Sequence, residues 1–112
     1  MTEPFRLAQL PGFADDFYAL PTANLQRMVL QLLAGVQNGT KHGAPLQNLP
    51  AVGDLSDCRK IYFDTDGNGK PRYRLVYRLT PDEIHAAAIE AVAVGERANL
   101  AAYRHAVRHL GR

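Results

Sequence analysis

Four residues in the second half of the chain have the side chains that phosphate chemistry requires: Lys60, Arg74, Arg97 and Tyr103. The first two lie in alternating apolar and polar runs, Arg97 follows an apolar segment, and Tyr103 lies in an amphipathic one. Fixed cations around a titratable hydroxyl suit a polyanionic substrate whose negative charge grows during the reaction. The sequence therefore predicts that these four side chains converge on a phosphate group.

The charge distribution supports a local anion-binding face. The net charge is +2, but residues 1–57 carry three Lys or Arg against five Asp or Glu, whereas residues 58–112 carry ten against six. The two halves are therefore −2 and +4, and an uneven distribution of this kind favours a polyanion-binding surface. The alternative is an ordinary mixture of solvated surface charges.

The length and composition predict one domain in a reducing compartment. A chain of 112 residues fits a single compact domain, residues 1–112, with one core. No apolar run approaches the length of a membrane helix, and the N-terminal segment lacks the pattern of a secretory signal. Cys58 is the one cysteine and cannot form an internal disulfide, so we expect a cytoplasmic location and no membrane partner.

The pattern along the chain predicts an α+β fold. A short first strand precedes a helical hairpin, whose second helix follows a possible cap at Thr22 and stops near Gly39. Three strands joined by short connections follow, over residues 59–64, 73–79 and 84–94, and an amphipathic helix closes the chain. The expected order is β-α-α-β-β-β-α, with a small antiparallel sheet of about four strands and the hairpin packed on one face.

Strand alternation assigns the candidate residues to faces of this sheet. Lys60 and Tyr62 should share one face of their strand, and Arg74 and Arg78 one face of the next. The cationic faces of these two strands can then lie side by side in the sheet. Glu90 interrupts the apolar third strand, where it either pairs with an arginine across the sheet or acts as a catalytic base.

Two patterns that resemble metal sites are better explained otherwise. Residues 64–69 begin like a calcium loop, but the twelfth position, which should be a bidentate glutamate, is Leu75, so we predict a hairpin turn. His105 and His109 lie one helical turn apart, yet no third ligand is evident. We expect solvated histidines near the end of the helix, and no metal.

Residues 55–108 resemble the RelE/ParE toxin superfamily, in particular its RelE-like branch of messenger RNA interferases. Three blocks carry the resemblance: Leu-Ser-Asp-Cys-Arg-Lys-Ile at residues 55–61, Tyr-Arg-Leu-Val-Tyr-Arg at 73–78, and Val-Gly-Glu-Arg at 94–97 followed by Tyr103. The resemblance implies the toxin of a toxin–antitoxin pair that cleaves mRNA at the ribosome without a metal or other cofactor. It also implies a cognate antitoxin, and mRNA and the ribosome as partners. The alternative is a non-catalytic toxin of the ParE kind, which inhibits DNA gyrase by binding it.

The resemblance assigns the catalytic residues to Lys60, Arg74, Arg97 and Tyr103. A second strand lysine of some members is replaced by Tyr62, and the residue before Arg97, often basic, is Glu96; both changes weaken the positive field.

Cleavage by 2′-hydroxyl attack needs a base, positive charge on the phosphorane oxygens and an acid for the 5′-oxygen. We assign the positive charge to Arg74 and Arg97. Neighbouring cations should lower the pKa of Lys60 and of Tyr103, so either could be the base. Tyr62 and Arg78 are predicted to contact substrate by stacking or charge. Tyr103 could instead be a core tyrosine, since it lies on the apolar stripe of its helix.

Overall fold

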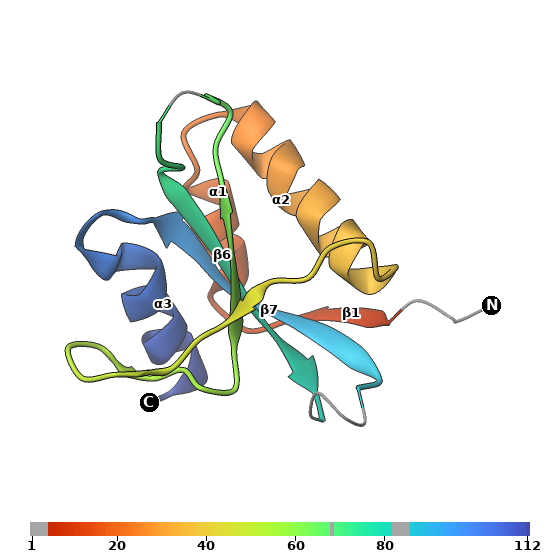
Figure 1. The fold of residues 1–112 in the computed structure, drawn as a ribbon, viewed down its shortest axis with the longest axis vertical. Coiled ribbons are helices and arrows are strands. Elements are labelled where there is room, and N and C mark those ends of the chain that lie inside the picture. Colours follow the sequence, from red (N-terminus) through yellow and green to blue (C-terminus); the bar gives the residue numbers. More distant parts are fainter. Residues whose placement is uncertain (1–4, 68, 82–85) are drawn as a thin grey trace.

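The chain folds into a mixed β-sheet with helices on both faces (Figure 1). The computed structural model describes residues 5–67, 69–81 and 86–112. The helices are α1 (Phe13–Tyr18), α2 (Ala23–Gln37), a short 3₁₀ helix η1 (Ala98–Leu100) and α3 (Ala101–Leu110). The strands are β1 (Arg6–Gln9), β2 (Ala44–Pro45), β3 (Asn48–Leu49), β4 (Gly53–Asp54), β5 (Arg59–Phe63), β6 (Tyr73–Thr80) and β7 (Ala88–Glu96).

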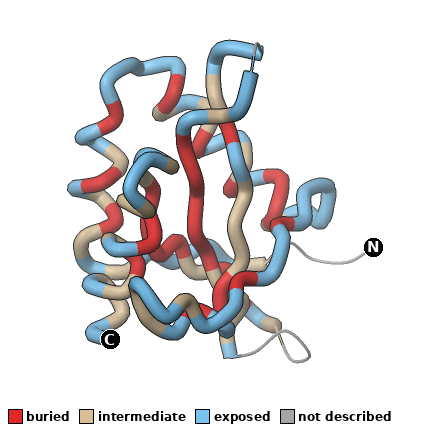
Figure 2. Tube along the Cα trace, turned by 60° about the vertical axis from the view of Figure 1, so that its left-hand side comes forward, coloured by how far each residue is buried: buried red, intermediate tan, exposed pale blue. Residues whose placement is uncertain are grey.

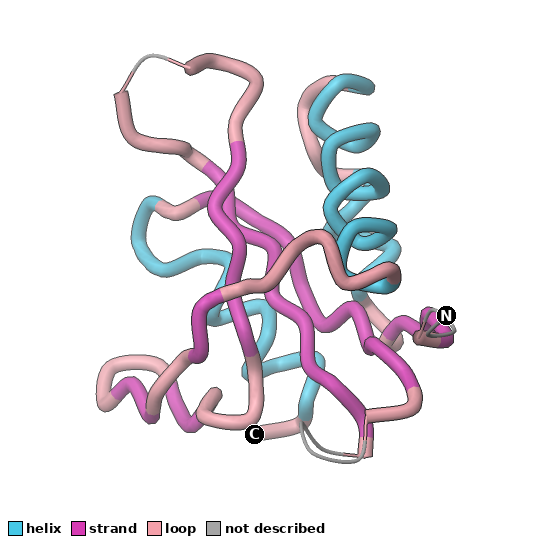
Figure 3. The backbone as a smooth tube through the Cα atoms, turned by 45° about the vertical axis from the view of Figure 1, so that its right-hand side comes forward, coloured by secondary structure: helices cyan, strands magenta, loops and turns pink. Residues whose placement is uncertain are grey.

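The main sheet has five strands in the order β1-β7-β6-β5-β2, and β3 and β4 form a separate two-stranded ribbon (Figure 3). β5, β6 and β7 pair antiparallel, as their short connections predict. The α+β class is therefore confirmed, and so is the order of the longer elements, but the short strands β2, β3 and β4 were not predicted. The sheet differs from the prediction in being mixed, because β1 is parallel to β7. A strand that is connected through helices, as β1 is, can pair in either direction. The sheet also contains β2, which has only two residues and is too short to show the alternation of a strand in the sequence.

Two parts of the predicted strands and turns cannot be compared. The third sheet strand was expected to begin at residue 84, and residues 82–85 lie outside the described part of the chain, as does residue 68 in the predicted hairpin turn.

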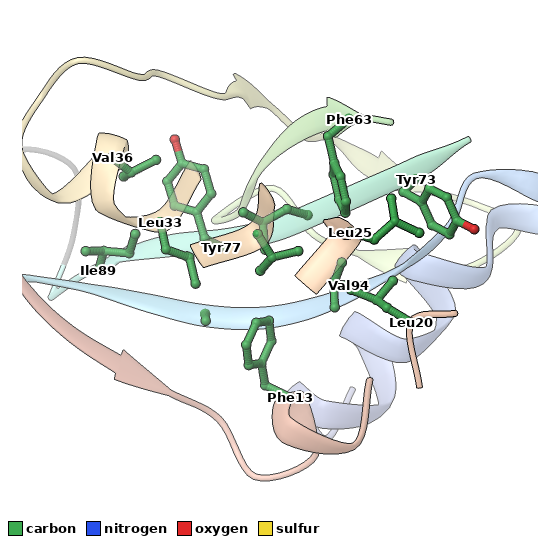
Figure 4. Packing of buried hydrophobic residues seen from close by; sticks show 13 residues of the cluster. Phe13, Leu20, Leu25, Leu33, Val36, Phe63, Tyr73, Tyr77, Ile89 and Val94 are labelled. Carbon is green, nitrogen blue, oxygen red and sulfur yellow. The ribbon is translucent and has the colours of Figure 1, made fainter. Parts of the chain in front are cut away.

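The helical hairpin covers one face of the sheet. Thr22 caps α2 as predicted, since its hydroxyl accepts a hydrogen bond from the Leu25 N–H at 3.2 Å. The apolar stripe of α2 and residues of α1 pack on inward-facing side chains of β5, β6 and β7 (Figure 4). None of the helices in the described ranges is long and apolar enough to span a lipid bilayer. The apolar stripe of α2 is therefore part of the core.

Helix α3 covers the opposite face, where a second apolar cluster includes Leu55, Val76, Val92 and Tyr103. The backbone is buried along the central strands, between the two helical layers (Figure 2). Gly95 in β7 allows α3 to approach closely, because a Cβ atom at this position would lie 3.3 Å from Cα of Ala102. The first turn of α3 therefore rests directly on the sheet beside Arg74, the cross-strand partner of Gly95.

A buried carboxylate holds α3 against α1. Asp16 is 7% exposed and accepts a hydrogen bond from the Val94 N–H at 3.3 Å. Its carboxylate oxygens lie 2.9 Å from Nε2 of His109 and 3.1 Å from Nδ1 of His105. The prediction of solvated histidines was wrong, because both rings turn towards this carboxylate and His109 is almost fully covered.

A second contact holds the C-terminal end of α3. Arg112 donates hydrogen bonds to both carboxylate oxygens of Asp57, at 2.6 and 2.7 Å. These bonds keep the pKa of Asp57 well below its usual range. The contact ties the residues after α3 to the loop that precedes β5.

We predict that Asp16→Ala lowers the free energy of unfolding by about 1–3 kcal/mol, because it leaves the buried Val94 N–H without an acceptor. Asp15→Ala, at an exposed position of the same helix, is the matched control and should change stability by less than about 0.5 kcal/mol. Urea unfolding of both variants measures the difference. Equal stability of the two variants would show that the carboxylate does not hold α3.

Candidate functional site

The structure brings three of the four predicted catalytic residues into one cluster with Tyr62. Lys60 and Tyr62 lie on the α3 face of β5, Arg74 lies next to them on β6, and Tyr103 reaches the same place from α3. The predicted alternation is confirmed, since Ile61 and Phe63 face the opposite core. Tyr62, Arg74 and Gly95 form a row of cross-strand partners on β5, β6 and β7. Because Gly95 has no side chain, α3 can pack against the sheet at the end of this row.

The guanidinium of Arg74 is the centre of the cluster. Its Cζ lies 4.3 Å from the ring centroid of Tyr103 and 5.2 Å from that of Tyr62. Lys60 Nζ lies 5.0 Å from the Tyr62 ring. Arg74 is 9% exposed, and its Nε and Nη1 find no hydrogen-bond acceptor in the described part of the chain. Buried N–H groups of a cation normally have acceptors, so these two unsatisfied donors make Arg74 a candidate site residue.

Arg97 extends the cationic surface on the other side of Arg74. Both residues line a pocket of about 410 Å³ together with Lys70, Arg72 and Glu96. The Arg97 N–H donates to the Arg72 carbonyl at 2.6 Å, which fixes the end of β7 against the start of β6. Arg97 and Arg74 thus line the same pocket.

The turn between Arg97 and α3 has an unfavourable backbone. Asn99 and Leu100 both take left-handed conformations, with φ of 56° and 57°. A leucine rarely adopts this region, and such strain concentrates at functional sites. The turn lets η1 and α3 follow β7 with almost no connecting residues, so that Arg97 and Tyr103 both remain beside Arg74.

The protonation states differ from those that the sequence suggested. The interaction with the Tyr62 hydroxyl raises the pKa of Lys60. Burial raises the pKa of Tyr103, and the charges of Arg74 and Lys60 oppose this only in part. Both predictions of a lowered pKa were wrong, because a hydroxyl partner outweighs desolvation at Lys60, and desolvation outweighs the neighbouring cations at Tyr103. The group whose pKa is lowered is Tyr62, through its interaction with Lys60.

Arg78 lies farther along β6 and is already paired. Its Nε donates to Glu90 at 2.5 Å and its Nη1 to Asp57 at 3.3 Å. Glu90 is therefore the cross-strand partner of an arginine, the first of its two predicted roles. The substrate contact predicted for Arg78 would have to compete with two carboxylates, and we leave this residue out of the site.

Sequence reasoning missed two cations of the pocket. Lys70 and Arg72 belong to the connection between β5 and β6, where a Gly-Lys-Pro-Arg run reads as a turn. Arg72 is held by Asp64 through two side-chain bonds of 2.8 and 3.0 Å. The sequence feature that could have identified Lys70 and Arg72 is their position shortly before Arg74. Within residues 5–67, 69–81 and 86–112 there is no group of three or more His, Cys, Asp or Glu side chains that could hold a metal ion.

Comparison with solved structures identifies the fold. A double arginine-to-alanine mutant of the E. coli toxin RelE, solved in the free state, superposes with a TM-score of 0.66. The two chains are 20% identical, and the match covers 94% of this chain and 96% of that one. No protein-family model matches the sequence, and neither does any curated protein. The chain therefore has the RelE toxin fold over nearly its whole length, and the resemblance found in the sequence is confirmed at the level of the fold.

Two buried tyrosines provide a test of the site's unsatisfied polar groups. The Tyr103 hydroxyl lies near Lys60 and Tyr62 but makes no hydrogen bond of normal geometry among the described residues, whereas the Tyr77 hydroxyl accepts the Gly43 N–H at 2.7 Å. We predict that Tyr103→Phe leaves the free energy of unfolding unchanged or slightly raised, because no bond is lost. Tyr77→Phe should lower it by about 1–3 kcal/mol, because a buried N–H loses its acceptor.

Chemical unfolding of the two variants beside the parent protein measures both effects. A loss of stability in Tyr103→Phe as large as that in Tyr77→Phe would mean that the Tyr103 hydroxyl is bonded within the protein and is not held for a ligand.

Proposed function

We propose that this chain is the toxin of a toxin–antitoxin pair and an endoribonuclease that cleaves mRNA at the ribosome without a metal ion. The observation that carries the proposal is the buried guanidinium of Arg74, with two donors that no described residue accepts. An arginine presents planar donors that match the oxygen atoms of a phosphate. Arg97 and Lys60 add positive charge on either side, and the RelE fold of the chain agrees with this use.

The proposed reaction is an intramolecular displacement at phosphorus. The 2′-oxygen of one nucleotide attacks the adjacent phosphate as its proton leaves, and the bond from phosphorus to the 5′-oxygen breaks as that oxygen gains a proton. The products are a 2′,3′-cyclic phosphate and a 5′-hydroxyl end. Negative charge grows on the phosphorane oxygens, and the guanidinium groups of Arg74 and Arg97 stabilise it.

The partners follow from this activity. The RelE structure is that of a toxin, and a nuclease that cuts mRNA would arrest the cell that makes it. We therefore propose that a cognate antitoxin binds this chain in the cytoplasm and holds it inactive until it is removed. The modest net charge of +2 would give weak binding to RNA alone. We therefore expect the ribosome to hold and orient the mRNA in the site.

We predict that Arg97→Ala lowers the rate of mRNA cleavage at the ribosome by about 10²–10³-fold, because one donor to the developing charge is lost. Arg27→Ala, an exposed arginine on α2, is the matched control and should keep the parental rate. The measurement is cleavage of a defined mRNA in purified translating ribosomes, with analysis of the end groups. Circular dichroism and antitoxin binding should be the same for both variants.

Parental cleavage by Arg97→Ala would remove this residue from the mechanism. Induced expression of the parent chain tests the function as a whole. Transcripts cut in a translation-dependent way support the nuclease, whereas blocked DNA supercoiling with intact transcripts would replace it with a gyrase inhibitor.

A further inference from the structure

The proposed cleavage needs a group that takes the proton of the 2′-hydroxyl, and this inference rests on that proposed function. A base must be reachable by the substrate and must be deprotonated in the reacting molecules. Three groups in the cluster can exchange a proton: Lys60, Tyr62 and Tyr103. The structure separates them by exposure and by the charges that each one faces.

Tyr103 and Lys60 are poorly suited to begin the reaction as the base. Tyr103 is 3% exposed, and burial disfavours its phenolate and raises its pKa. The pKa of Lys60 is raised as well, so its amine is protonated at neutral pH and has no lone pair to offer. Both groups therefore enter the reaction carrying their protons.

Tyr62 has the opposite surroundings. The residue is 42% exposed, so an RNA strand over the sheet can contact it. The groups that face it are Lys60 from its own strand, Arg74 from β6 and Tyr103 from α3. Lys60 Nζ and Arg74 Cζ lie 5.0 and 5.2 Å from its ring centroid. Two cations favour the phenolate, and the pKa of Tyr62 is lowered, chiefly by Lys60.

We propose that Tyr62 is the general base of the cleavage reaction: its phenolate oxygen takes the proton of the 2′-hydroxyl. The place of Tyr62 supports this role, since its cross-strand partner Arg74 would hold the phosphate next to the attacking 2′-oxygen. The new bond joins the 2′-oxygen to phosphorus, and the electron pair of the broken bond stays on the 5′-oxygen.

Lys60 completes the proton balance. Its ammonium gives a proton to the leaving 5′-oxygen, so the cluster ends the reaction with a neutral phenol and a neutral amine. One proton then passes from the Tyr62 hydroxyl to the Lys60 amine, because the two side chains interact directly. This transfer restores the phenolate and the ammonium, and no proton is gained or lost by the protein over the cycle.

The test is Tyr62→Phe, which keeps the ring against Lys60 and Arg74 and removes only the hydroxyl. We expect kcat for cleavage of a defined mRNA in translating ribosomes to fall by about 10²–10⁴-fold, with KM nearly unchanged. The parental rate should rise with pH as the phenol ionises, and the variant should lose this dependence. Tyr18→Phe, an exposed tyrosine on α1, is the control and should keep both rate and pH profile.

A titration of the purified proteins gives a readout without RNA. Ultraviolet absorbance of phenolate should show that one tyrosine of the parent ionises at a lower pH than an ordinary tyrosine. This transition should be present in Tyr18→Phe and absent from Tyr62→Phe. An unchanged rate and pH profile in Tyr62→Phe would overturn the role of Tyr62 while leaving the nuclease standing. Intact mRNA with the parent protein would overturn both proposals together.

Discussion

The site depends on one electrostatic constraint, the burial of the Arg74 guanidinium with no carboxylate partner among the residues that the structure describes. Removing a cation from water is costly, and the rings of Tyr62 and Tyr103 offset part of that cost, by about 0.5–2 kcal/mol for each cation–π contact. Since Nε and Nη1 find no acceptor among the described residues, we propose that a bound anion recovers the rest of this cost. The same water-poor surroundings strengthen the attraction to a phosphate.

The rest of the fold can be understood as the means of keeping this cation in place. Cross-strand pairing puts Tyr62 on one side of Arg74, and Gly95 on the other side leaves room for the first turn of α3. Helix α3 brings Tyr103, and it is held at two points, by Asp16 under its histidines and by Asp57 at Arg112. A shift of α3 would remove one of the two rings that cover Arg74, so the docking of this helix and the state of the site are linked.

Much of the fold and part of the site could be predicted from the sequence. The period of two in β5 and β6 correctly placed Lys60, Tyr62 and Arg74 on one face, because that face is fixed by burial of the alternate residues. Long-range features could not be predicted: the parallel pairing of β1, the buried carboxylate of Asp16, and the contact of Arg78 with Asp57 all depend on segments that meet only in three dimensions. The pKa directions of Lys60 and Tyr103 were wrong for the same reason, since burial and the nearest hydroxyl decide them.

The most direct test of the central claim is nuclear magnetic resonance of the arginine side-chain Nε–H groups during titration with a short single-stranded RNA whose 2′-oxygens are methylated and cannot react. We predict that the Arg74 signal shifts with added RNA, because its unsatisfied donors gain phosphate acceptors, while the signal of Arg78, which already donates to Glu90, stays in place. A shift at Arg78 with an unchanged Arg74 signal would contradict the account, since RNA would then bind this face without using the buried guanidinium.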